Sequence, residues 1–125
     1  MKSMSLDNVL LFHQKIVAKT GGSDGIRDIG LIESALNRGF ATFGGEELYK
    51  EDELKVAAIS HGLIRNHGFV DGNKRIGVAV LVFLLKLNSI NIRYTQQELI
   101  DLGLSTAEGK KDENDIYEWI IKYKV

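Results

Sequence analysis

The sequence predicts an all-α fold with about six helices, in a single domain that covers residues 1–125. Apolar residues recur at the three- and four-residue spacing of helices, whereas the alternation typical of half-buried strands is missing. The ten residues from Ile76 to Leu85 carry no polar side chain, which is typical of a helix buried on all sides. A membrane span needs ~20 apolar residues, so this run is too short to cross a bilayer. We therefore expect a compact bundle around one central buried helix.

The first two helices are predicted from their caps and apolar faces. One is expected over Ser5–Thr20, where Gly21 ends it, and the next follows an Asp28 cap and reaches Asn37. His13 lies in the first helix, without a second metal-binding side chain at helical spacing. We therefore expect His13 to be exposed or hydrogen-bonded rather than a metal ligand.

The stretch from Arg38 to Lys50 has no helical periodicity and is the longest irregular segment. Its aromatic residues are expected to be exposed: Phe40, Phe43 and Tyr49. Long loops in compact domains often carry function, so this segment is either a binding edge or a mobile connector. The residues alone leave both readings open.

The third and fourth helices are expected over about Asp52–Asn66 and Asn73–Leu87. Asn88 is expected to end the fourth helix in a left-handed conformation. Gly77 lies inside that helix, where glycine costs ~1 kcal/mol relative to alanine. We expect this glycine to let another helix or a ligand come close.

A short connector over 88–94 precedes the last two helices. Thr95 and Glu98 form a capping-box pattern, which predicts a fifth helix that reaches about Thr106. The sixth is expected from about Glu113, with apolar residues at core spacing: Ile116, Trp119, Ile120 and Tyr123.

Composition excludes several classes of protein. The net charge is −1 and the pI about 6.3, so we expect no nucleic-acid partner and no attraction to anionic membranes. There is no cysteine, hence no disulfide framework and no thiolate metal site. The chain does not start with an apolar segment and cleavage site, so we expect a cytoplasmic protein without a secretory signal.

The start of the fourth helix breaks a local rule. Unpaired backbone N–H groups make a helix N-terminus partly positive, so acidic residues normally stand there. Here the first turn carries Lys74 and Arg75. Gly72 leaves room for an anion and permits a tight turn that exposes N–H groups. The pattern predicts a phosphate site at this helix start.

The neighbouring residues suit phosphate chemistry. Asp71 is a hard oxygen ligand of the kind that Mg²⁺ takes beside substrate phosphates. Asn73 donates two hydrogen bonds and accepts others. His67 can take a proton from a hydroxyl, although a histidine there can also merely cap the carbonyls of the preceding helix. Phe69 is expected to point into the core and pin the loop.

The loop from His67 to Arg75 reads His-Gly-Phe-Val-Asp-Gly-Asn-Lys-Arg and resembles the signature loop of the Fic/Doc family. That family's pattern is His-x-Phe-x-Asp/Glu-Gly-Asn-Gly/Lys-Arg. Lys74 matches the death-on-curing (Doc) branch, and the segment from Gly25 to Ala35 is similar to the N-terminal region of that branch. The resemblance implies a Fic-like helical bundle.

The resemblance also implies a role for each matching residue. His67 would be the general base and Asp71 the metal ligand. The Gly72 backbone and Asn73 would form the phosphate cradle. The two cations that follow would hold nucleotide phosphates: Lys74 and Arg75.

Two positions depart from the family pattern. AMP-transferring Fic enzymes usually carry a second arginine where this chain has Val78, which weakens the prediction of AMP transfer. The proline that commonly follows the motif histidine is Gly68 here, and we expect that glycine to loosen the loop.

By resemblance, the protein would be a Doc-like toxin. It would transfer the γ-phosphate of ATP, with Mg²⁺, to a hydroxyl of a target protein, by resemblance elongation factor Tu, and so arrest translation. The alternatives are an AMP transferase of the main Fic branch and a catalytically silent nucleotide- or phosphate-binding module. Fic-like proteins dock the target's backbone on a flap, which here would be Phe43, Gly44 and Gly45.

The family's inhibitory pattern, Ser/Thr-x-x-x-Glu-Gly/Asn, is missing. Leu104 stands four residues before Glu108, and Gly109 four residues before Glu113. The resemblance therefore implies a cognate antitoxin that acts in trans.

Overall fold

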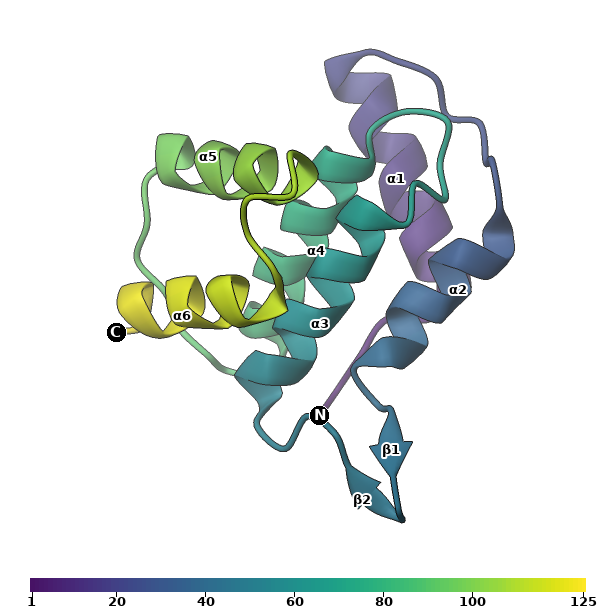
Figure 1. Cartoon of the computed structure of the whole chain (residues 1–125). Coiled ribbons are helices and arrows are strands. Elements are labelled where there is room, and N and C mark those ends of the chain that lie inside the picture. The colour runs from purple at the N-terminus through teal and green to yellow at the C-terminus, as the bar shows by residue number, and fades with distance from the viewer.

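A computed structural model describes residues 1–125 and confirms the predicted all-α architecture of six helices (Figure 1). The helices are α1 (Leu6–Thr20), α2 (Ile29–Arg38), α3 (Asp52–Arg65), α4 (Asn73–Leu87), α5 (Gln96–Ala107) and α6 (Glu113–Tyr123). A two-stranded hairpin, β1 (Thr42–Phe43) and β2 (Glu46–Glu47), lies between α2 and α3. None of the helices combines the length and the apolar character that crossing a membrane requires.

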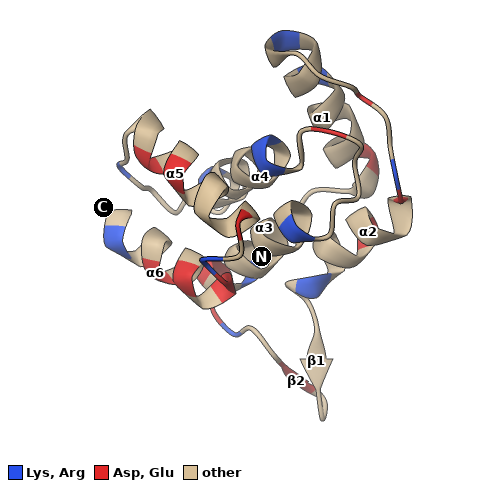
Figure 2. Cartoon of the chain, turned by 45° about the horizontal axis from the view of Figure 1, so that its top comes forward, with Lys and Arg blue, Asp and Glu red and all other residues tan.

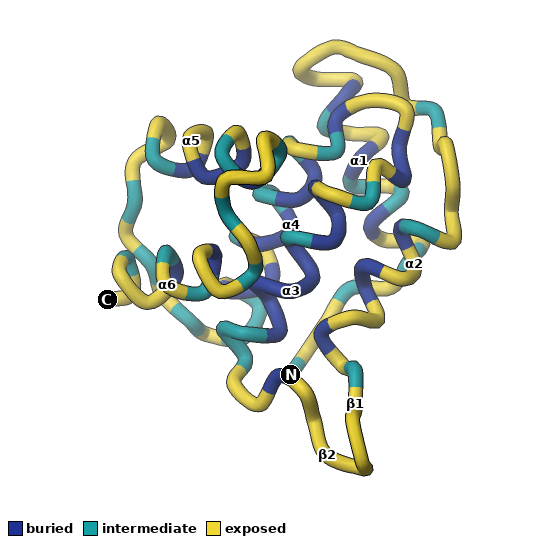
Figure 3. The backbone as a smooth tube through the Cα atoms, viewed as in Figure 1, coloured by how far each residue is buried: buried dark blue, intermediate teal, exposed yellow.

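Helix α3 is the most enclosed element. Every residue from Lys55 to Ser60 is buried, and α3 packs against α2, α4, α5 and α6 (Figure 3). Helix α4 lies beside it and buries most of the apolar run predicted from the sequence. The prediction that this run is buried on all sides is wrong at Phe83. That side chain is 42% exposed and meets Phe12 of α1 edge-on.

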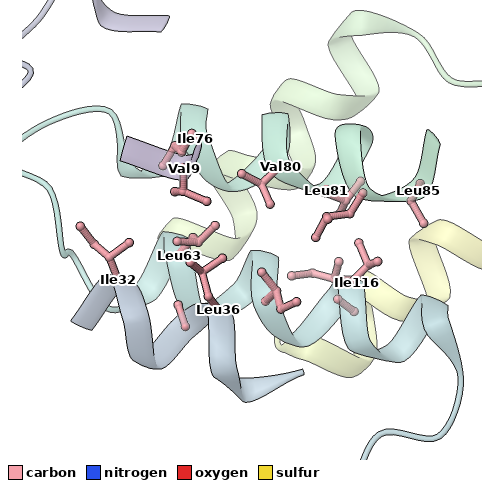
Figure 4. Close-up of a cluster of buried hydrophobic side chains, with 14 of the residues drawn as sticks. Val9, Ile32, Leu36, Leu63, Ile76, Val80, Leu81, Leu85 and Ile116 are labelled. Atoms are coloured by element: carbon pink, nitrogen blue, oxygen red, sulfur yellow. The ribbon is translucent and has the colours of Figure 1, made fainter. Parts of the chain in front are cut away.

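Close packing between α3 and α4 depends on a glycine. A Cβ atom on Gly77 would lie 2.3 Å from Cγ1 of Ile64, and the Ser60 hydroxyl donates to the Gly77 carbonyl at 2.9 Å. The expectation of a close helix approach at Gly77 is therefore confirmed. Apolar side chains from α4 and from the facing helices meet in the core next to this contact (Figure 4).

The hairpin corrects the prediction of an irregular segment over 38–50. Thr42 pairs with Glu47, and Phe43 with Glu46, in antiparallel register. Gly44 and Gly45 make the two-residue turn with φ of 61° and 83°, a conformation that favours glycine and matches the twist of a tight hairpin. The hairpin projects from the body of the molecule (Figure 1).

The aromatic residues of this segment do not behave alike. Phe43 is 83% exposed and Phe40 is 42% exposed, as expected, but Tyr49 is buried at 6%. Tyr49 is enclosed because its hydroxyl donates to Glu113 of α6 at 2.7 Å, while its carbonyl accepts from the buried ammonium of Lys55. Lys55 also pairs with Glu47 at 2.9 Å, so a buried cation ties the hairpin to α3.

Three predicted helix starts are confirmed by their caps. Ser5 and Asp28 accept backbone hydrogen bonds at the starts of α1 and α2, and Thr95 and Glu98 form the predicted capping box. The left-handed end of α4 was predicted one residue too early. Asn88 has φ of −100°, whereas Ser89 has φ of 60°.

Candidate active site

The loop between α3 and α4 is held along its backbone by the segment before α2. The N–H groups of Arg27 and Asp28 both donate to the Gly68 carbonyl at 2.9 Å, and the Val70 N–H donates to the Gly25 carbonyl at 2.9 Å. A Cβ atom on Gly68 would lie 2.4 Å from Cγ1 of Ile32. The expectation that Gly68 loosens the loop is therefore wrong, because the glycine lets the loop lie directly against α2.

Phe69 anchors the loop in the core, as predicted. It is 2% exposed, and its ring stacks on His13 of α1 with centroids 3.7 Å apart and planes 11° from parallel. The Nε2 atom of His13 lies 2.6 Å from the Asp71 carbonyl oxygen. A carbonyl only accepts, so Nε2 carries the proton. His13 is thus buried and hydrogen-bonded, and it fixes the loop backbone at the predicted metal ligand.

Asn73 closes the loop onto itself. Its side-chain carbonyl accepts from the Phe69 N–H at 3.0 Å, and its amide donates to the Phe69 carbonyl at 3.0 Å. Much of the side chain is therefore committed to loop structure. A role of Asn73 in binding phosphate stays a prediction, and it rests mainly on the backbone N–H.

The start of α4 has the open geometry that the sequence predicted. Gly72 is left-handed, with φ of 78° and ψ of 15°, and no side chain caps the helix. The backbone N–H groups of Asn73, Lys74 and Arg75 make no hydrogen bond within the chain. Three unpaired donors at the positive end of a helix suit an anion, and phosphate binding here stays a prediction.

Asp71 presents an ionised carboxylate beside these donors. Hydrogen bonds from the backbone N–H groups of Gly72 (2.7 Å) and Ser23 (3.3 Å), with a smaller contribution from the guanidinium of Arg75 at 3.4 Å, lower the pKa of Asp71. Gly22 permits this approach, because a Cβ atom there would lie 2.2 Å from the Asp71 carboxylate.

This donor set fits Mg²⁺ held largely by phosphates. No group of three or more His, Asp or Glu side chains is gathered in the chain. One half-exposed carboxylate beside a phosphate site is the usual protein contribution to such a magnesium ion.

The two cations of the first turn point to different partners. Arg75 donates to the Thr20 hydroxyl at 2.5 Å and the Gly21 carbonyl at 2.7 Å, at the C-terminal end of α1. Lys74 is exposed, and its stem lies against α5, where a Cβ atom on Gly103 would be 3.2 Å from the Lys74 Cγ. Figure 2 shows the basic first turn of α4 and the acidic position in the loop before it.

His67 follows the last residues of α3. It is exposed and has φ of 52°. The alternative that its imidazole caps α3 is not observed, because the imidazole makes no hydrogen bond within the chain. The carbonyls of Asn66 and His67 accept from the guanidinium of Arg27 instead. The imidazole therefore stays free for chemistry.

All six motif residues predicted to act in the site line one open cavity of about 350 Å³. Its walls are His67, Asp71, Gly72, Asn73, Lys74 and Arg75, with Ile64, Val70 and Ala107. Phe43, Gly44 and Gly45 are not part of it. The loop contacts the first turn of α2, whereas the hairpin follows the last turn of α2. The ten residues of α2 span about 15 Å, which separates the hairpin from the loop by about that distance.

Sequence reasoning missed the residues of α1 and its following loop that support the site: His13, Thr20, Gly21, Gly22 and Ser23. Helix periodicity marked the core face of α1 but does not identify partners about 50 residues away. The Gly21–Gly22 pair was a usable signal, since two consecutive glycines after a helix suggest a close backbone approach.

Comparison with known proteins agrees with this geometry. A sequence model of the Fic/DOC family matches residues 3–85. The chain is 39% identical over 72 residues to the protein named Toxin Doc of Mycolicibacterium smegmatis, a match that covers 58% of this chain and 55% of that protein. It is 26% identical over 110 residues to Protein kinase doc of Escherichia phage P1, covering 88% of this chain and 86% of the phage protein.

The chain thus spans just over half the length of the mycobacterial relative and most of the phage relative. The family match begins before α1 and ends within α4, so it includes every element that holds the loop. On these grounds the protein belongs to the Fic/Doc family.

Proposed function

We propose that this protein is a toxin that transfers the γ-phosphate of ATP to a hydroxyl of a target protein in the cytoplasm. The observation that carries the proposal is that a free imidazole, His67, and an uncapped helix start line one cavity. Phosphoryl transfer needs mainly positioning and charge stabilisation, which such an arrangement supplies. One relative is named a toxin and the other a protein kinase.

In the proposed reaction, His67 takes the proton of the attacking hydroxyl. A bond forms between that oxygen and the γ-phosphorus while the bond to the bridging oxygen breaks, and ADP leaves. The unpaired N–H groups at the start of α4 and the Lys74 ammonium hold the phosphate chain. Asp71 would ligate Mg²⁺, which supplies neutralisation of phosphate charge.

Two residues favour transfer of the γ-phosphate over transfer of AMP. Lys74 puts a flexible cation where AMP-transferring relatives have glycine, so it fills the space in which their nucleotide phosphates lie. Val78 contacts α5 and lines a separate apolar cavity, so no second arginine is available at that position. Both differences support the opposite orientation of ATP, with the γ-phosphate next to His67.

The partners belong to the same proposal. The target is elongation factor Tu, docked on the hairpin around Phe43, Gly44 and Gly45, and its modification arrests translation. Because the hairpin lies about 15 Å from the loop along α2, a docked segment must extend from the hairpin to His67. A cognate antitoxin, acting in trans, keeps the protein inactive.

The deciding experiment uses ATP labelled separately on the α- and γ-phosphate, incubated with the purified protein, Mg²⁺ and elongation factor Tu. Label from the γ position on the target supports the proposal, and label only from the α position overturns it in favour of AMP transfer. The His67→Ala variant is the control, since loss of a general base lowers transfer by ~10²–10⁴-fold. Wild-type turnover in that folded variant would refute the assigned role of His67.

The toxin assignment has its own test. Expression of the protein alone is expected to arrest growth, and co-expression of the antitoxin gene is expected to relieve the arrest. Growth at the normal rate with the intact protein present would contradict the assignment.

A further inference from the structure

The backbone of His67 adopts a conformation that L-residues rarely take. Only two residues other than glycine have positive φ in this chain, and His67 is one of them, at 52°. A left-handed residue with a side chain persists only when its surroundings hold it in place. The left-handed backbone of His67 therefore depends on contacts from neighbouring residues.

The guanidinium of Arg27 makes contacts on both sides of the His67 Cα atom. Its Nε donates to the His67 carbonyl at 2.6 Å, and its Nη2 donates to the Asn66 carbonyl at 3.2 Å. These carbonyls follow the last turn of α3, where helix geometry provides no partner. One planar group thus binds the carbonyls of the two consecutive peptide units that flank the Cα atom of His67.

The position of Arg27 is itself fixed by the loop that it supports. Its backbone N–H donates to the Gly68 carbonyl at 2.9 Å, and Ile26 pairs with Phe69 in an isolated antiparallel bridge. The side chain therefore reaches His67 from a backbone anchored one residue further along the same loop.

We propose that Arg27 is a positioning residue. It holds the left-handed backbone of His67, so that the imidazole faces the phosphate cavity. Arg27 is not among the residues that line that cavity, and two of its donors are committed to carbonyls. It acts through His67 rather than on a phosphate.

Lysine does not reproduce this contact. The two donors of Arg27 are held in one rigid plane, whereas lysine offers a single ammonium on a flexible stem. Arg27→Lys keeps the positive charge but loses the planar pair of donors, and Arg27→Gln loses both the charge and the planar pair. Arg93→Gln removes an exposed arginine far from the loop in sequence, without a side-chain partner in the structure, and is the matched control.

The kinetic test rests on the proposed phosphoryl transfer. Displacing a catalytic group by about 1 Å can cost ~10²-fold, so Arg27→Gln and Arg27→Lys are expected to lower kcat about 10- to 100-fold with KM for ATP within about twofold. In a His67→Ala background, Arg27→Gln should change the residual rate less than about twofold. A raised KM for ATP with unchanged kcat, or an equal loss in both backgrounds, would overturn the proposal.

A second readout does not depend on activity. The protein has three histidines, so a proton–carbon NMR spectrum of the imidazole groups contains three sets of signals. Arg27→Gln is expected to shift the His67 signals and leave those of His61 in place, whereas Arg93→Gln should shift neither. Unchanged His67 signals in the folded variant would overturn the inference.

The two readouts separate the two proposals. If wild-type protein transfers no phosphate but Arg27→Gln still moves the His67 signals, the proposed function fails and the positioning role stands. If Arg27→Gln unfolds the protein, the Arg27→Lys variant carries both measurements. Loss of folding in both variants would overturn the proposal, because Arg27 would then support the fold as a whole.

Discussion

Replacing Gly68 by alanine separates two opposite accounts of the loop. If the glycine only made the loop flexible, alanine would stabilise the fold by ~0.4–1 kcal/mol, because it restricts the unfolded chain. The structure predicts the reverse sign. A Cβ atom at this position would lie 2.4 Å from Cγ1 of Ile32 and 3.2 Å from the Asp28 carbonyl oxygen. Overpacking of this kind costs ~1–3 kcal/mol.

The cost is tied to one neighbouring atom, which allows a double-mutant cycle. Ile32→Ala removes the Cγ1 atom and by itself costs ~2–5 kcal/mol, since Ile32 is 1% exposed. In that background most of the overlap is gone, so Gly68→Ala should cost less than about 1 kcal/mol. The double mutant is thus expected to be ~1–2 kcal/mol more stable than the summed costs of the two single mutants would make it.

Urea unfolding followed by circular dichroism measures each corner of the cycle. With a slope of ~2 kcal/mol per molar urea, Gly68→Ala should lower the midpoint by ~0.5–1.5 M. An unchanged or higher midpoint for Gly68→Ala would refute the argument from packing, and an equal cost in the Ile32→Ala background would show that another neighbour is responsible.

Three further predictions concern the metal, acid stability and the target. Asp71→Asn should abolish the tightening of ATP binding by Mg²⁺ in calorimetry, because the ionised ligand is lost; wild-type tightening would exclude Asp71 as ligand. Burial raises the pKa of Glu113, but hydrogen bonds from Arg38 and Tyr49 outweigh it, so the pKa lies below the usual 4.5. The ionised form therefore stabilises the fold above about pH 4.5, and this contribution is lost as the pH falls through the lowered pKa. Glu113→Gln should cost ~1–3 kcal/mol at pH 7 in urea unfolding and converge with wild type in acid; a constant difference down to pH 3 would contradict this. Phe43→Ser should raise KM for elongation factor Tu several-fold at unchanged ATP affinity, and an unchanged KM would remove the hairpin from target docking.

Local signals in the sequence account for what was predicted correctly. The helix starts at Ser5, Asp28 and Thr95 follow from side chains that cap backbone N–H groups within three residues. The open start of α4 follows from Gly72 and the missing acidic cap. Each of these features depends on neighbours in the chain, which a sequence displays directly.

What was missed depends on contacts between distant segments. His13 meets the Asp71 carbonyl across 58 residues, and Arg27 meets the His67 carbonyl across 40. Ordinary residue types make both contacts, and periodicity shows only which face of a helix is apolar. The hairpin was missed for another reason, since strands of two residues are too short to show alternation. The Gly44–Gly45 pair, a favoured two-residue turn, was its one signal.

The structure also changes how the unfavourable placement of two cations at the partly positive start of α4 is understood. Arg75 is accommodated without any ligand, because its guanidinium meets the carbonyl end of α1 and the Asp71 carboxylate. Phe69 and Asn73 are likewise committed to holding the loop. Groups that face the cavity with hydrogen-bonding capacity left are the His67 imidazole, the Lys74 ammonium, part of the Asp71 carboxylate, part of the Arg75 guanidinium and three backbone N–H groups. The motif therefore combines residues that hold the loop with residues that face the cavity, and Arg75 does both, so its contact with the proposed nucleotide stays a prediction.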